Sequence, residues 1–164
     1  MNNNKRGFPI KETAIATLMM VAVFTFFSSA TLSNILPNRE GNLEQLEYRK
    51  SISIRDVIRQ QIEAFKRNEI SAAFDLATPE IQDQFRTSDI FFQMVIKNYA
   101  VILTHKTWNF GNLTKIRNEE YIQTVNFYEK DGRVLKALYV MEQQPEGTWR
   151  IGGCKLILDF ELAT

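Results

Sequence analysis

Residues Tyr121–Gln143 read YIQTVNFYEKDGRVLKALYVMEQ, and the fold class follows from this segment. β-Branched and aromatic residues dominate both of its halves, as is typical of β-strands. The Asp131-Gly132 pair in its middle favours a tight hairpin turn, because these residues accept positive φ at low cost. The stretch therefore predicts an antiparallel hairpin with strands at 121–129 and 134–143. The second strand is apolar on both faces, which indicates a central strand covered on both sides.

The same texture continues on both sides of this hairpin. We expect one strand at 104–110 and a second strand, or its continuation, at 113–117. A last strand is expected at 148–160, after a turn rich in Pro and Gly. Within it, the Gly152-Gly153 pair indicates a bulge or a bend.

Before the strands, apolar residues recur with helical spacing. A first helix is expected to start near Ser51–Ser53. The residues of its apolar face are Ile54, Val57, Ile58, Ile62 and Phe65. Three short helices should follow it: one around Ala72–Leu76, one that starts at Pro79 with Thr78 as its cap, and one capped by Ser88-Asp89.

Helices followed by an antiparallel meander are the signature of an α+β fold. We expect N-terminal helices packed on a curved antiparallel sheet, as in cone-shaped, cystatin-like or nuclear-transport-factor-like folds. The chain then divides into a leader at 1–30, a linker or helix extension at 31–50, and a single α+β domain at 51–164.

The leader has the order of a secretory signal. Basic residues precede the uncharged run Thr13–Phe27, and the small residues Ser28-Ser29-Ala30 follow it. Cleavage after Ala30 is one interpretation. The other is a retained membrane anchor, because Ala14–Leu36 is long enough to span a bilayer. Both place the domain outside the cytoplasm: periplasmic or secreted, or anchored to the inner membrane with the domain outside.

Charge and cysteine content exclude several classes of function. The 20 Lys and Arg residues nearly balance the 19 Asp and Glu residues, so the chain lacks the positive field that attracts nucleic acid. The single cysteine, Cys154, rules out an internal disulfide. No spacing of His, Cys and Asp resembles a metal site, so we expect no metal and no cofactor.

Two residues with reactive side chains are given structural roles. His105 is the only histidine and has no obvious orienting partner, so we expect it at the surface or at a rim. Cys154 follows Gly153 in an apolar strand. We expect it to pack as a small buried residue, because a reactive thiol needs a basic, partly exposed setting.

Three motifs carry a resemblance to a known family. Gln61-x-x-Ala64-Phe65 comes first, Ala73-Phe74 and Thr78-Pro79-x-Ile81 follow, and Trp149-Arg150-Ile151-x-Gly153-Cys154 closes the chain. In this order and spacing they resemble a bacterial domain-of-unknown-function family, number 4864. The resemblance implies a small α+β domain, often exported, with no established activity and no catalytic residues to carry over.

The aromatic residues are the best indication of a ligand site. Folds of the cone type enclose a cavity between helices and sheet, and an apolar pocket with a few hydroxyls suits a small ligand. The candidate pocket residues are Tyr99, Trp108, Phe110, Phe127, Tyr139 and Trp149. The alternative is a filled cone without a cavity.

We therefore expect an exported, non-enzymatic domain that binds a small apolar ligand or an envelope protein. One alternative is a cone-fold isomerase or hydrolase, for which Asp75 and Tyr99 are an imaginable pair. Another is a structural protomer that forms a homodimer through its open sheet face. The absence of an evident pair of catalytic groups favours the first and third of these interpretations.

Overall fold

The structure is a computed structural model, and it describes residues 39–158. The chain divides into two compact units, Met1–Leu46 and Glu47–Thr164, and the fold considered below is that of the second unit. The described elements, in chain order, are α2 (Arg39–Lys66), α3 (Ile70–Asp75), α4 (Pro79–Phe85), α5 (Ser88–Asn98), α6 (Ala100–Thr104), β1 (Thr107–Arg117), β2 (Glu120–Tyr128), β3 (Val134–Gln143) and β4 (Trp149–Leu158). The leader lies outside the described residues.

The four strands form one antiparallel sheet in the order β1-β2-β3-β4. β2 and β3 form the hairpin expected from the sequence, with Gly132 at a φ of 91° in its turn. The backbone N–H of Arg133 donates a 3.0 Å hydrogen bond to Asp131 Oδ1, which fixes the turn. Helices followed by this meander confirm the predicted α+β class.

Two of the irregularities in the strand pairing occur at glycines. The pairing of β3 with β4 shifts between Val140, which lies opposite Gly153, and Met141, which lies opposite Ile151. Gly152 is the extra residue of this bulge, as the Gly-Gly pair predicts. A second shift interrupts the pairing of β1 with β2 between Phe110 and Leu113. The two predicted strand segments are parts of one strand, which begins at Thr107; the predicted start at Thr104 is wrong, because α6 extends to Thr104.

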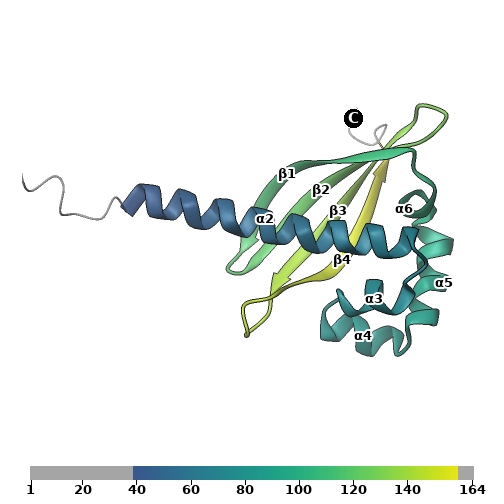
Figure 1. Ribbon diagram of the computed structural model, residues 1–164, viewed down its shortest axis with the longest axis horizontal. Coiled ribbons are helices and arrows are strands. Elements are labelled where there is room, and N and C mark those ends of the chain that lie inside the picture. Colours follow the sequence, from purple (N-terminus) through teal and green to yellow (C-terminus); the bar gives the residue numbers. More distant parts are fainter. Residues whose placement is uncertain (1–38, 159–164) are drawn as a thin grey trace, which may run out of the picture. The chain divides into compact units, whose positions relative to one another are not determined.

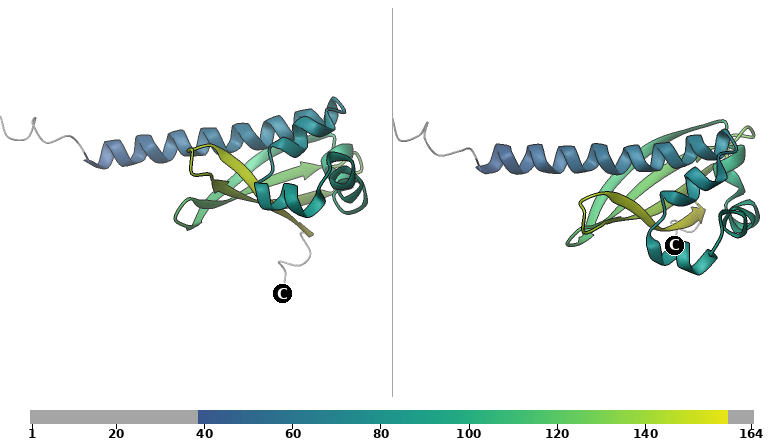
Figure 2. Two further views of the ribbon diagram at one scale, coloured as in Figure 1. Left: turned by 90° about the horizontal axis from the view of Figure 1, so that it is seen from below. Right: turned by 60° about the horizontal axis from the view of Figure 1, so that its bottom comes forward.

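α2 covers one face of this sheet from Glu47 onward (Figures 1 and 2). Three residues of its apolar stripe, Ile54, Ile58 and Ile62, have no exposed surface, and Val57 is partly buried. Every second residue of the facing strands is buried with it, which is the periodicity of a half-covered sheet. Each fully buried side chain of this size contributes about 1.5–3 kcal/mol of transfer free energy.

The polar residue Gln123 lies inside this core, and the bulge in β1 explains its position. Gln123 is fully buried. Its Nε2 donates to the carbonyl oxygens of Gly111 and Asn112 at 3.0 and 3.2 Å, and its Oε1 accepts from Arg55 Nε at 3.2 Å. The bulge interrupts the strand pairing at these two residues, and the carboxamide supplies their carbonyls with a donor.

The short helices α3 to α6 gather at the end of the sheet where α2 ends (Figures 1 and 2). α4 starts at Pro79 after Thr78, as expected, although the Thr78 side chain makes no capping hydrogen bond. α5 is capped by Thr87, whose hydroxyl accepts from the N–H of Ile90 at 3.3 Å, so the predicted cap at Ser88 is one residue off. The helix expected to start near Ser51 begins at Arg39.

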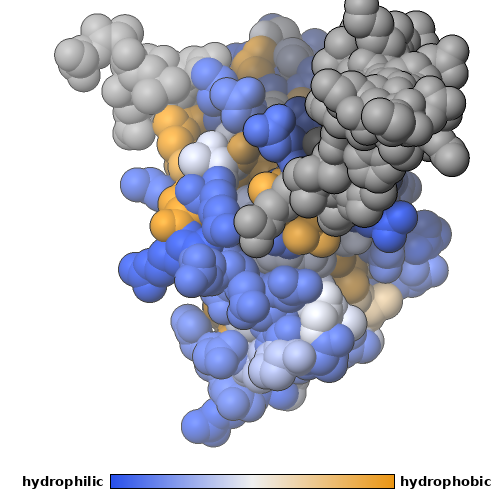
Figure 3. All heavy atoms as spheres, turned by 90° about the vertical axis from the view of Figure 1, so that its left-hand side faces the viewer, coloured by the Kyte–Doolittle hydropathy of each residue, from blue (hydrophilic) through white to orange (hydrophobic). Residues whose placement is uncertain are grey.

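On one face of the described part of the chain, the visible surface is largely polar (Figure 3). On the face shown in Figure 3, hydrophobic residues occur in separate small groups among hydrophilic ones, where the coloured residues are visible. Within residues 39–158, no helix combines the length and the apolar character that a membrane span requires.

Candidate functional site

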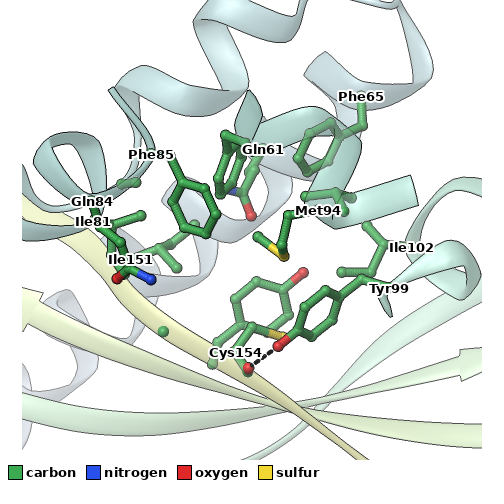
Figure 4. A pocket seen from close by; sticks show the side chains of 15 residues that line it. Gln61, Phe65, Ile81, Gln84, Phe85, Met94, Tyr99, Ile102, Ile151 and Cys154 are labelled. Atoms are coloured by element: carbon green, nitrogen blue, oxygen red, sulfur yellow. Dashed lines mark hydrogen bonds between the residues drawn. The ribbon is translucent and has the colours of Figure 1, made fainter. Parts of the chain in front are cut away.

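A cavity of about 230 Å³ lies between the second half of α2, the helices α4 to α6, and the strands β3 and β4. Its wall is mostly aromatic and aliphatic, and Figure 4 shows the side chains of Phe85, Met94 and Tyr99 converging on it. No Asp, Glu, Lys, Arg or His is among the residues that line it. The site is therefore an apolar pocket with a few neutral polar groups.

The chain that connects α3 to α4 is held to the bulged strand and so fixes one wall of the pocket. Ala77 and Ile151 form an isolated parallel β-bridge, and both line the pocket. The N–H of Ile151 donates to the carbonyl of Leu76 at 2.9 Å, and the N–H of Thr78 donates to the carbonyl of Ile151 at 3.0 Å. The bulge at Gly152 therefore lies beside the point where β4 meets the helices.

The aromatic part of the wall is a packed cluster that holds the helices together. Phe91 of α5 contacts Phe85 of α4 edge-on, with ring centroids 5.5 Å apart. It also packs against Phe65 of α2, at 6.3 Å. All three rings line the pocket. Aromatic pairs in such arrangements contribute about 0.5–1.5 kcal/mol each beyond their area burial, so they help to hold α2, α4 and α5 together.

Two polar side chains of the pocket, those of Tyr99 and Gln61, already form hydrogen bonds within the protein. The Tyr99 hydroxyl donates a 2.6 Å hydrogen bond to the backbone carbonyl of Cys154, drawn as the dashed line in Figure 4. Gln61 is buried, and its Nε2 donates to the carbonyl of Ala73 at 3.2 Å. This bond fixes the orientation of the carboxamide, whose oxygen points into the pocket in Figure 4.

Tyr139 is the exceptional residue of the site. It lines the pocket and has no solvent-exposed surface, yet its hydroxyl has no hydrogen-bond partner. Burial raises the pKa of this hydroxyl well above its ordinary value, and the neighbouring Cys154 and Tyr99 raise it further. The group is therefore a neutral donor that leaves its hydrogen-bonding capacity unused, which buried polar groups rarely do.

Cys154 lies on the same wall and is half-buried. Burial raises the pKa of its thiol to about 12, so the thiolate is nearly absent at neutral pH. A nucleophilic role therefore has no support in its surroundings.

The structure brings two of the six candidate pocket residues, Tyr99 and Tyr139, to this cavity. Phe127 lies in the core without exposed surface, and Trp149 is buried edge-on against Tyr121 at 5.5 Å. Trp149 also borders a separate groove, together with residues of α2 between Arg49 and Val57.

The remaining two candidates, Trp108 and Phe110, form a pair on the edge strand β1, with ring centroids 5.0 Å apart. The guanidinium groups of Arg55 and Arg59 lie over the Phe110 ring at 5.5 and 5.8 Å from its centroid. Neither aromatic residue lines the cavity described above.

Sequence reasoning missed the helical residues of the pocket, of which Gln61 carries a usable signal. Gln61 lies three residues after Ile58 and seven after Ile54, so it belongs to the buried stripe of an amphipathic helix. A polar residue at such a position needs a partner inside the protein. Phe85 and Met94 carry no comparable signal, because apolar residues of short helices are equally compatible with plain core packing.

His105 does not lie at the surface or at a rim, where we expected it, but is buried. It follows α6, and its Nδ1 lies 3.2 Å from the carbonyl of Val101. Its ring packs on Phe127 with centroids 5.1 Å apart, and its Nε2 has no partner. His105 is buried because it directly follows α6, whose residues Val101 and Ile102 are themselves buried in the core. His105 is not among the residues of the pocket.

Within residues 39–158, no group of three or more His, Cys, Asp or Glu side chains is arranged to hold a metal ion. The candidate acid–base pair is also not assembled. Asp75 is exposed at the end of α3, and it is not among the lining residues of the pocket that contains Tyr99.

Comparison with known proteins agrees with the motifs quoted above. The model of the family described as "Domain of unknown function (DUF4864)" matches residues 47–163. This range contains the whole of the sheet and every residue of the pocket. No curated protein and no solved structure shows a significant similarity to the chain.

Proposed function

The chain belongs to the DUF4864 family, and we propose that its domain is a non-enzymatic binding module that takes one small, mainly apolar molecule into the pocket. The observation that carries the proposal is Tyr139, a buried residue of the mostly apolar pocket wall whose hydroxyl has no partner. A buried hydroxyl without a partner costs about 1–3 kcal/mol. A bound molecule that supplies an acceptor recovers this energy.

The size of the pocket limits the ligand. An apolar cavity of about 150 Å³ accommodates a benzene molecule, and this one measures about 230 Å³. It therefore suits a single ring with a short substituent, or a short aliphatic chain. The rings of Phe65, Phe85 and Phe91 offer edges and faces that favour an aromatic ligand.

The composition of the pocket argues against catalysis. General acid–base chemistry needs a group that gains or loses a proton near neutral pH, within reach of the substrate. The lining residues include no carboxylate, imidazole or amine. The hydroxyl of Tyr99 is engaged with a backbone carbonyl, and the pKa of Tyr139 is raised far from this range.

A titration of the full-length protein with toluene tests the proposal. Binding is followed by backbone amide NMR shifts, with the variant Ala77→Leu as the pocket-filling comparison. Ala77 is buried and lines the pocket, so the larger side chain occupies space that the ligand needs. The matched control is Ala72→Leu, since Ala72 is exposed on α3 and lies outside the pocket lining.

The expected result is saturable binding of toluene to the natural protein and to Ala72→Leu, and its loss in Ala77→Leu. Equal binding to all three proteins would place the ligand elsewhere. No binding to the natural protein would refute the proposal.

We also propose that the domain acts outside the cytoplasm. The support is the basic, apolar and small-residue order of the leader, which lies outside the described residues. Cell fractionation should find the protein in the periplasm or on the outer side of the inner membrane, and a cytoplasmic pool of full-length chain contradicts this. An N-terminus at Thr31 indicates cleavage, and one at the start of the chain indicates a retained anchor.

A further inference from the structure

We infer that the ligand of this pocket carries a neutral polar end that both accepts and donates a hydrogen bond, an alcohol being the simplest case. The acceptor function meets the Tyr139 hydroxyl, and the donor function meets the carboxamide oxygen of Gln61. This inference rests on the proposed function and names the chemical class of molecule that the pocket selects.

Tyr139 supplies the donor side of this recognition. Its hydroxyl is fully buried and unpartnered, while the hydroxyl of Tyr99, which also lines the pocket, already donates to the carbonyl of Cys154. A ligand therefore finds one free hydroxyl rather than two. The folded protein already bears the cost of removing this hydroxyl from water. A ligand atom that accepts a hydrogen bond from Tyr139 therefore gains that bond without a further desolvation cost for the hydroxyl.

Gln61 supplies the acceptor side. Its Nε2 is used by the carbonyl of Ala73, and this bond leaves the carboxamide oxygen facing the cavity (Figure 4). Because a carboxamide oxygen has no hydrogen to give, it can only accept. A ligand that can only accept hydrogen bonds, such as a nitrile, satisfies the Tyr139 hydroxyl and leaves the carboxamide oxygen of Gln61 without a donor.

The lack of charge in the wall excludes ionic ligands. None of the lining side chains is a carboxylate, an ammonium, a guanidinium or an imidazole. A carboxylate or an ammonium group that enters such a site loses its hydration and gains no opposite charge, which is strongly unfavourable. The pocket therefore discriminates a neutral alcohol from an acid or an amine of the same size.

A series of five molecules with one ring and one substituent tests this inference on the full-length protein. Toluene has no polar group, benzonitrile only accepts, and benzyl alcohol accepts and donates. Benzoate and benzylammonium carry a negative and a positive charge. Dissociation constants are measured at neutral pH from backbone amide NMR shifts, for the natural protein and for Tyr139→Phe.

Tyr139→Phe removes one buried oxygen atom and keeps the ring that forms the wall, so the pocket retains its shape. We expect benzyl alcohol to bind the natural protein about tenfold more tightly than toluene, since it adds two hydrogen bonds of modest net strength. Benzonitrile should lie between them, and neither ion should bind measurably. In Tyr139→Phe, benzyl alcohol should lose most of its advantage over toluene, and the affinity for toluene should stay the same.

Equal affinities for toluene and benzyl alcohol in both proteins would overturn the inference and leave the proposed function standing, because toluene still binds. Binding of benzoate or benzylammonium as tight as that of benzyl alcohol would do the same. If none of the five molecules binds, the proposed function fails and the inference fails with it.

Discussion

The Tyr99 hydroxyl donates a 2.6 Å hydrogen bond to the backbone carbonyl of Cys154, which lies 55 residues further along the chain. Tyr99 stands between α5 and α6, and Cys154 belongs to β4 just after the bulge. The bond therefore ties the helices that close the pocket to the strand that forms its opposite wall.

The first prediction concerns this bond. Tyr99→Phe should lower the free energy of unfolding by about 1 kcal/mol, because it removes one partly buried hydrogen bond and keeps the ring. Urea unfolding of the full-length protein measures the change. The control is Tyr48→Phe, since Tyr48 is 62% exposed and should be neutral. If both variants unfold like the natural protein, the bond does not stabilise the fold.

The second prediction concerns the reactivity of the only cysteine. Because burial raises the pKa of the Cys154 thiol to about 12, iodoacetamide should label it far more slowly in the folded protein than in urea. Toluene should slow the labelling further, because Cys154 lines the pocket. Mass spectrometry of quenched samples follows the reaction. Rapid labelling of the folded protein would show that the thiol is accessible and activated.

The third prediction concerns His105 and pH. Burial is the largest cause that lowers the pKa of this imidazole, and nearby Lys66 lowers it too. The carbonyls of Val101 and Ile102 and the carboxylate of Glu63 act in the opposite direction and only partly offset this. The unfolded chain takes up its proton near pH 6.5, and the folded ring takes up its proton only at a lower pH. The free energy of unfolding should therefore decrease as the pH falls below about 6.5, until the folded ring also titrates.

The variant His105→Asn isolates this effect, because the asparagine amide keeps a donor at the position of Nδ1 for the Val101 carbonyl and does not titrate. Urea unfolding at a series of pH values between neutral and mildly acidic should give a steeper loss for the natural protein than for the variant. Parallel curves would show that the histidine titrates alike in the folded and unfolded chains.

The fourth prediction compares the two tryptophans. Trp149 is 7% exposed and packs edge-on against Tyr121, so Trp149→Ala should cost about 3–5 kcal/mol of stability. Trp108→Ala is the matched control, since Trp108 is only partly buried against the core and should cost less. Circular dichroism melts of both variants give the order. A Trp149→Ala protein that melts like the natural one would place Trp149 outside the structural core.

The sheet could be predicted from the sequence because its signals are local. Alternation and the Asp131-Gly132 turn place β2 and β3 within a residue of their positions in the structure, and the Gly152-Gly153 pair places the bulge. The start of α2 could not be placed in the same way. Gly41 suggests a break, but one glycine in a helix costs only about 1 kcal/mol, and the Glu, Leu, Gln and Arg residues around it favour the helix.

The pocket was only partly predictable, for a physical reason. Tyr99 and Tyr139 stand out as aromatic residues with hydroxyls, but which aromatics face a cavity depends on how α4 and α5 approach β4. That approach is set by contacts between distant segments, such as the bridge between Ala77 and Ile151. Trp108 and Phe110 are aromatic residues of a predicted strand, as Tyr139 is, but they lie on the edge strand β1 and not at the cavity.

The site of contact between toluene and the full-length protein decides whether the pocket is the binding site. Intermolecular nuclear Overhauser effects report which methyl groups lie beside the ring protons of the ligand. We expect such effects to the methyl groups of Met94, Ile81 and Ile102, all of which line the pocket. Effects confined to exposed residues such as Ile52, Ile90 and Ile116 would contradict this expectation, because the ligand would then adhere to the surface and the pocket would bind nothing.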